Sequence, residues 1–127
     1  MPRLSAILAL FLVTSLARAG DIQQLLQLID YVGVDYGEAV ADGAVVNAGE
    51  YAEMQDFAAG IVQQSRDLPD NAARARVQQQ ADELARQVAA RASPQRISTL
   101  TTAMRLAVVD GYKVTVIPRK LPDLARA

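Results

Sequence analysis

Four stretches of this chain place apolar or small side chains at helical spacing, and this pattern strongly favours an all-α fold. Short segments that contain glycine, proline or helix-capping residues separate the four stretches. The positions are Ile22, Leu25, Ile29 and Val32; Tyr51, Met54, Ala58, Ile61, Ser65 and Leu68; Val77, Ala81, Leu84 and Val88; and Ile97, Leu100, Met104 and Val108. Four amphipathic helices with short connections predict a small antiparallel four-helix bundle.

The boundaries of the first helix are predicted from local signals. Asp21 is a candidate N-cap, and Gly33 is expected to end the helix. Residues 34–49 contain three glycines and no regular apolar pattern. This segment is therefore expected to form a structured loop, with one helical turn at residues 38–41.

The third and fourth helices also have start signals. Pro69 and Asp70 are expected to break the chain and to cap the third helix. Ser93 is a predicted N-cap and Pro94 occupies the first position of the fourth helix, where its missing N–H costs nothing. The fourth helix is expected to end near Gly111.

The pattern changes after the fourth helix. Residues 113–117 are expected to be extended, and Pro118 and Pro122 give the remaining tail little helix potential. The predicted organisation is a signal peptide at 1–19, a helical bundle domain at 20–111 and an extended tail or linker at 112–127.

The first nineteen residues have the features of a secretory signal peptide. Arg3 supplies a positive charge, residues 4–16 form a short apolar run, and residues 17–19 read Ala-Arg-Ala, which is an A-x-A cleavage site. The mature chain is therefore expected to begin at Gly20 and to be periplasmic. The alternative, an uncleaved membrane anchor, would need a longer apolar run.

Composition narrows the chemistry. The chain contains no histidine and no cysteine, which removes the usual zinc and copper ligands, disulfides, haem attachment and Ser-His-Asp catalysis. Residues 21–70 carry 10 acidic and 1 basic side chains, whereas residues 71–127 carry 4 acidic and 10 basic ones. The two halves could neutralise each other, or they could present an acidic surface opposite a basic one. No catalytic pair is apparent, so the chain is not expected to be an enzyme.

The acidic half contains a candidate cation site. Between Arg18 and Arg66 there is no basic residue, and a hard cation such as ferric iron prefers carboxylate and phenolate oxygens. Tyrosines in the same segment are more typical of packing residues, and Met54 is expected in the core. Glutamates at the start of a helix are also favoured by the helix dipole without any metal. The candidate ligands are Asp35, Glu38, Glu50, Glu53 and Asp56.

The run D-Y-V-G-V-D-Y-x-E-A-V-x-D-G-x-V-x-N-x-x-E-Y-x-E-M-Q-D-F, at residues 30–57, resembles the periplasmic N-terminal region of bacterial high-affinity iron permeases of the Ftr type. In many of those proteins this helical domain precedes a c-type cytochrome domain and then the membrane permease. Residues 112–127 look like the linker that leads to the haem domain. The chain has neither a C-x-x-C-H haem motif nor the R-E-x-x-E motifs of the permease, so the resemblance covers only the leading module.

The resemblance implies an exported accessory domain of an iron-uptake system. Such a domain would bind iron weakly, with no certain resident cofactor, or would dock to the membrane permease or its c-type cytochrome. A metal-free periplasmic structural or interaction module is the alternative. Neither nucleic acid binding nor a membrane span in the mature chain is expected.

Overall fold

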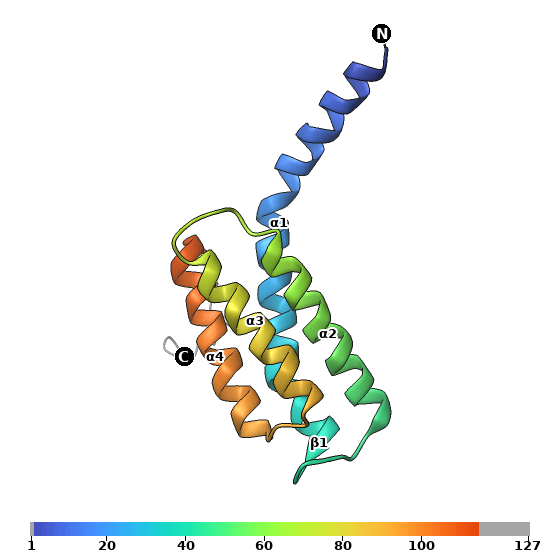
Figure 1. Cartoon of the computed structure of the whole chain (residues 1–127), viewed down its shortest axis with the longest axis vertical. Coiled ribbons are helices and arrows are strands. Elements are labelled where there is room, and N and C mark those ends of the chain that lie inside the picture. The colour runs from blue at the N-terminus through green and yellow to red at the C-terminus, as the bar shows by residue number, and fades with distance from the viewer. Residues whose placement is uncertain (1, 115–127) are drawn as a thin grey trace, which may run out of the picture.

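The computed structural model describes residues 2–114, which form four helices and one short hairpin (Figure 1). Helix α1 (Pro2–Ala39) is followed by strands β1 (Val40–Ala41) and β2 (Ala44–Val45), and then by α2 (Ala48–Arg66), α3 (Arg74–Ala89) and α4 (Pro94–Tyr112). The predicted bundle is confirmed. Of the predicted tail, residues 115–127, with Pro118 and Pro122, lie outside the described residues.

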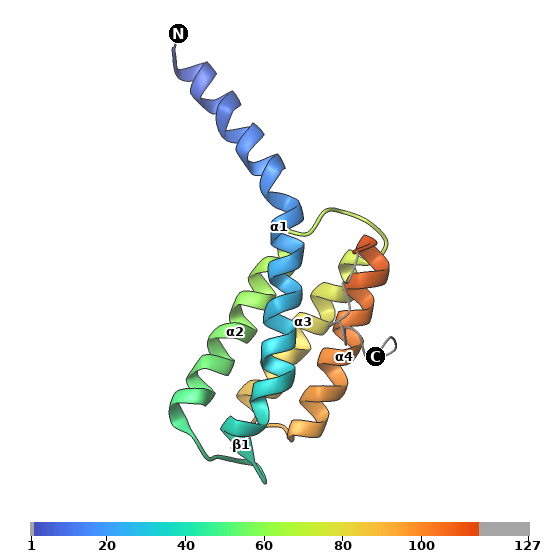
Figure 2. The same cartoon turned by 180° about the vertical axis from the view of Figure 1, so that it is seen from behind.

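The helices form a closed ring in which each contacts two neighbours. Helix α1 packs against α2 and α4, and α3 packs against the same two helices from the opposite side (Figures 1 and 2). The N-terminal part of α1 extends past the ends of the other helices (Figure 1). The seam between α1 and α2 lies across the ring from the seam between α3 and α4. The two seams are therefore on opposite faces of the bundle.

The predicted apolar stripes form the core. On α3 all four predicted positions are buried, and on α2 every position from Met54 onward is buried, including the following Leu68. On α4 the buried face includes Thr101, while Leu100 is only partly buried. The helical spacing therefore identified nearly all of the side chains that hold the bundle together.

Helix α1 does not end at Gly33, which corrects the sequence-based prediction. The helix continues to Ala39, and Asp21 lies within it and is not its N-cap. A Cβ atom placed on Gly33 would lie 2.8 Å from the Thr101 Oγ1 atom of α4. Glycine is present here because α4 passes close to α1, so the residue serves helix packing.

The predicted loop at residues 34–49 is largely ordered as regular structure, and the helical turn predicted at 38–41 is wrong beyond Ala39. Strands β1 and β2 pair antiparallel, with Val40 opposite Val45. Asp42 and Gly43 join them and have φ angles of 53° and 75°. Two residues of positive φ suit the twist of a tight hairpin, and Asp-Gly is a favoured pair there.

The start of α3 also differs from the prediction. Its N-cap residue is Ala73, whose side chain makes no capping bond. The Asn71 Oδ1 atom instead accepts hydrogen bonds from the N–H groups of Ala73 and Arg74, at 2.8 and 3.1 Å, so Asp70 is not the cap. The predicted Ser93 cap of α4 is confirmed, because its side chain accepts from the N–H of Arg96.

Candidate acidic site

The candidate site lies on the seam between α1 and α2, toward the hairpin end of the bundle. The rings of Tyr31 and Phe57 stack across this seam with centroids 5.8 Å apart. The two helices run antiparallel. The turn of α1 from Tyr31 to Asp35 therefore lies beside the turn of α2 that leads back from Phe57 to Glu53. A further turn brings Glu38 level with the start of α2.

Glu50 is the centre of this group of carboxylates. Its pKa is raised above the ordinary value by desolvation first, and then by the negative charges of Glu53, Glu38 and Asp35. Three of the other four predicted ligands are therefore near enough to repel Glu50. We call Asp35, Glu38, Glu50 and Glu53 the carboxylate cluster.

Asp56 does not contribute to this interaction. It is exposed on α2, and its charge is not among those that raise the pKa of Glu50. Each step of three residues along a helix falls about 60° short of a full turn, so two steps from Glu50 place Asp56 about 120° around the helix. The structure therefore does not place this fifth predicted ligand with the others.

No basic side chain among the described residues neutralises the carboxylate cluster. The ion pairs found among the side chains of residues 21–114 use other carboxylates. They are Arg74–Asp70 at 3.9 Å, Arg86–Glu83 at 2.6 Å and Arg105–Asp30 at 2.6 Å. The cluster thus carries an electrostatic cost that a cation or a basic partner would relieve.

Local structure also favours one of these charges without any ligand. The Asn47 side chain caps α2 by accepting a hydrogen bond from the Glu50 N–H at 3.0 Å. Glu50 then lies in the first turn, where the helix dipole stabilises negative charge. The dipole explanation applies to Glu50 alone. Asp35 and Glu38 lie near the C-terminal end of α1, where the helix dipole does not favour negative charge.

Two tyrosines of the acidic segment serve the fold rather than the site. The Tyr36 hydroxyl donates a 2.6 Å hydrogen bond to the carbonyl oxygen of Ala92, and that of Tyr51 donates one of the same length to Val88. Burial, with a smaller contribution from Tyr51, raises the pKa of Tyr36 to about 12. Both hydroxyls are therefore donors to backbone carbonyls, and the sequence alone did not reveal these partners. Met54 is fully buried, as expected of a core residue.

The donor chemistry of the cluster suits a hard cation, but its arrangement is open. Carboxylate oxygens are the ligands that such cations prefer, and histidine and cysteine are absent from the chain. Among the described residues, no three acidic side chains converge as they would in a preformed metal centre. The geometry therefore fits weak attraction of a hydrated cation better than tight coordination.

We compared the chain with known proteins. A family model described as the iron permease-associated 4-helix bundle domain matches residues 15–113, which include all of the bundle except the N-terminal part of α1. No curated protein and no solved structure matched the chain. Within residues 21–114, no helix is both long and apolar enough to cross a membrane.

Proposed function

This chain belongs to the family of iron permease-associated four-helix bundle domains, and we propose that it serves iron uptake as an exported, non-catalytic accessory domain. In this role it attracts iron ions weakly at the carboxylate cluster and presents them to the permease. The family membership supports the role in iron uptake. The exported location and the iron site are our proposals.

The observation that supports iron binding is the uncompensated charge between α1 and α2. Glu50 interacts there with three other carboxylates, and the ion pairs of the described side chains do not include any of the four. A cation lowers the repulsion among them and gains hard oxygen ligands of the kind that iron accepts. Because no three of the acidic groups converge, we expect the iron to retain part of its water shell.

A metal-free docking module is the second candidate. Exposed apolar side chains flank the carboxylates along the chain, namely Tyr31 and Val34 on α1 and Val46 beside the hairpin. Mixed apolar and charged surfaces of this kind are typical of transient protein interfaces. The partner in that case is the permease or a c-type cytochrome with a basic surface.

Calorimetric titration with ferrous iron under anaerobic conditions separates the two candidates. In the double variant Glu50→Gln/Glu53→Gln, we expect the affinity to fall by about tenfold or more, equivalent to roughly 1.4 kcal/mol or more. Lower pH should also weaken iron binding to the wild type, because protons compete with iron for the Glu50 carboxylate. Since the pKa of Glu50 is raised, this competition begins at a higher pH than it would for an isolated carboxyl group.

The matched control is Asp67→Asn/Asp70→Asn. It removes the same charge at the same spacing, but just beyond the other end of α2. Its iron affinity should equal that of the wild type. Equal affinity in all three proteins, or no binding in any, would reject the iron site and leave the docking module.

The proposed export is tested separately. The charged, apolar and A-x-A succession of residues 1–19 predicts cleavage after Ala19. Mass spectrometry of the protein from the periplasmic fraction should then show Gly20 as the N-terminal residue. An intact Met1 recovered with the membranes would contradict the cleavage.

A further inference from the structure

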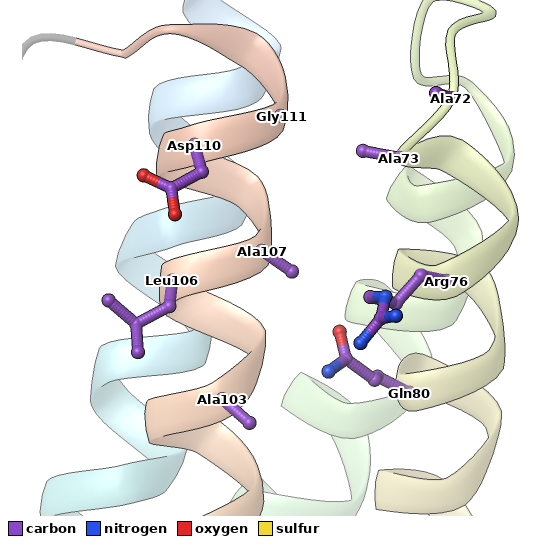
Figure 3. Close-up of a pocket in the computed structure, with 9 residues that line it drawn as sticks. All are labelled: Ala72, Ala73, Arg76, Gln80, Ala103, Leu106, Ala107, Asp110 and Gly111. Carbon is purple, nitrogen blue, oxygen red and sulfur yellow. The ribbon is translucent and has the colours of Figure 1, made fainter.

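The seam between α3 and α4 contains a groove on the face opposite the carboxylate cluster. Its first part has a volume of about 540 Å³ and is lined mainly by small side chains, as Figure 3 shows. Ala103 and Ala107 of α4 point toward α3, while Ala73, just before α3, points toward α4 (Figure 3). A second hollow of about 630 Å³ shares Ala103 and continues the groove toward Gln87. The helical rise from Ala73 to Gln87 gives the groove a length of roughly 21 Å.

An exposed leucine lies beside this groove. Leu106 of α4 is 58% exposed and points away from α3 (Figure 3). A single exposed leucine is common on protein surfaces. Here, however, the protruding side chain and a hollow lined by alanines belong to the same surface patch, so the patch could fit a copy of itself.

The charged side chains of the groove could also pair with those of a second copy of the patch. Arg76 lies on the α3 side and Asp110 on the α4 side, and neither takes part in an ion pair with a side chain of residues 21–114. A neighbour that brings both charges would pair with Arg76 and Asp110.

We infer that the α3/α4 groove is the interface of a two-fold symmetric dimer of this chain. A two-fold interface uses one patch on both subunits, so that patch must contain complementary features. Leu106 of each copy enters the alanine-lined groove of the other, and Arg76 of each copy faces Asp110 of the other. The two carboxylate clusters lie on the outer faces, where they stay accessible. This inference does not depend on the proposed iron binding.

Sedimentation equilibrium of the purified full chain over a range of concentrations tests the dimer. We expect a reversible monomer–dimer equilibrium, and Leu106→Asp should raise the dissociation constant by about tenfold or more because it places a charge where the dimer buries a leucine. The matched control is Val34→Asp on α1, where the side chain is 77% exposed and lies on another face. It should leave the dissociation constant unchanged.

A charge exchange provides the second test. Arg76→Asp and Asp110→Arg should each weaken the dimer, because each places like charges opposite one another, and the double variant should restore it. Circular dichroism identifies any variant that fails to fold. A chain that stays monomeric at every concentration, or a dimer unaffected by Leu106→Asp and by both charge variants, would overturn the inference.

Discussion

Replacing Leu84 with alanine is expected to lower the free energy of unfolding by about 2–5 kcal/mol. Leu84 is fully buried on α3 and is the largest of the four buried side chains of that helix. Helix α3 has no acidic residue in its first turn, and the hydrogen bonds that Asn71 accepts from Ala73 and Arg74 support only its start. Its position therefore depends on the burial of its apolar stripe, and the cavity left at Leu84 cannot be compensated from within the helix.

Denaturant unfolding followed by circular dichroism measures this loss. The control is Leu106→Ala on α4, which removes the same atoms from a side chain that is 58% exposed and should cost about 0.5 kcal/mol or less. Both variants should be measured in dilute solution, where self-association contributes nothing. Similar losses in the two variants would contradict the assignment of α3 to the core.

The prediction of the bundle from sequence succeeded because burial in a helical bundle follows local periodicity. All four predicted positions on α3 are buried, and Ser65 is buried on α2 although it is polar, because its position in the stripe decides its burial. The Ser93 cap was also correct, because an N-cap acts within one turn of its own residue.

The failed predictions concern residues whose partners are distant in sequence. Gly33 has the local features of a helix stop, and only the approach of Thr101 from α4 explains why a glycine is needed within α1. The missed hairpin has another cause than the missed continuation of α1, because Asp42-Gly43 is a turn signal that can be read from the local sequence. That signal was missed because β1 and β2 contain only two residues each, too few to show an alternating pattern.

The candidate site was predictable only in part, because the sequence pattern shows which residues are neighbours on one helix and not which helices pack together. Spacing along one helix identifies Glu50 and Glu53 as neighbours. Asp35 and Glu38 were expected in a loop, so their pairing on α1 required the structure. That the two pairs interact depends on how α1 packs against α2, which the sequence pattern does not specify. The roles of Tyr36 and Tyr51 also required the structure, because their hydroxyls bond to carbonyls at the far end of α3 and just beyond it.

Replacing Gly111 with alanine is the second change expected to have a large effect, with a loss of about 1–3 kcal/mol in the free energy of unfolding. A Cβ atom at this position would lie well inside the contact distance of the Ala73 Cβ atom, and an alanine cannot rotate away. The junction has little room to adjust. The Asn71 side chain donates a 2.9 Å hydrogen bond to the Gly111 carbonyl, and the Tyr112 hydroxyl donates one of 2.8 Å to Pro69.

The sign of this effect distinguishes packing from helix propensity. Alanine is favoured over glycine inside a helix by up to about 1 kcal/mol, so propensity alone predicts that Gly111→Ala stabilises α4. Gly60→Ala on α2 is the control, because its added methyl group would meet the Leu28 Cδ1 atom only at an ordinary 3.5 Å, and it should be neutral or stabilising. The double variant Gly111→Ala/Ala73→Gly should recover most of the lost stability, since it removes the atom that collides. Thermal unfolding of the four proteins measures these differences, and a stabilising Gly111→Ala would show that α3 and α4 are farther apart at this end than the structure places them.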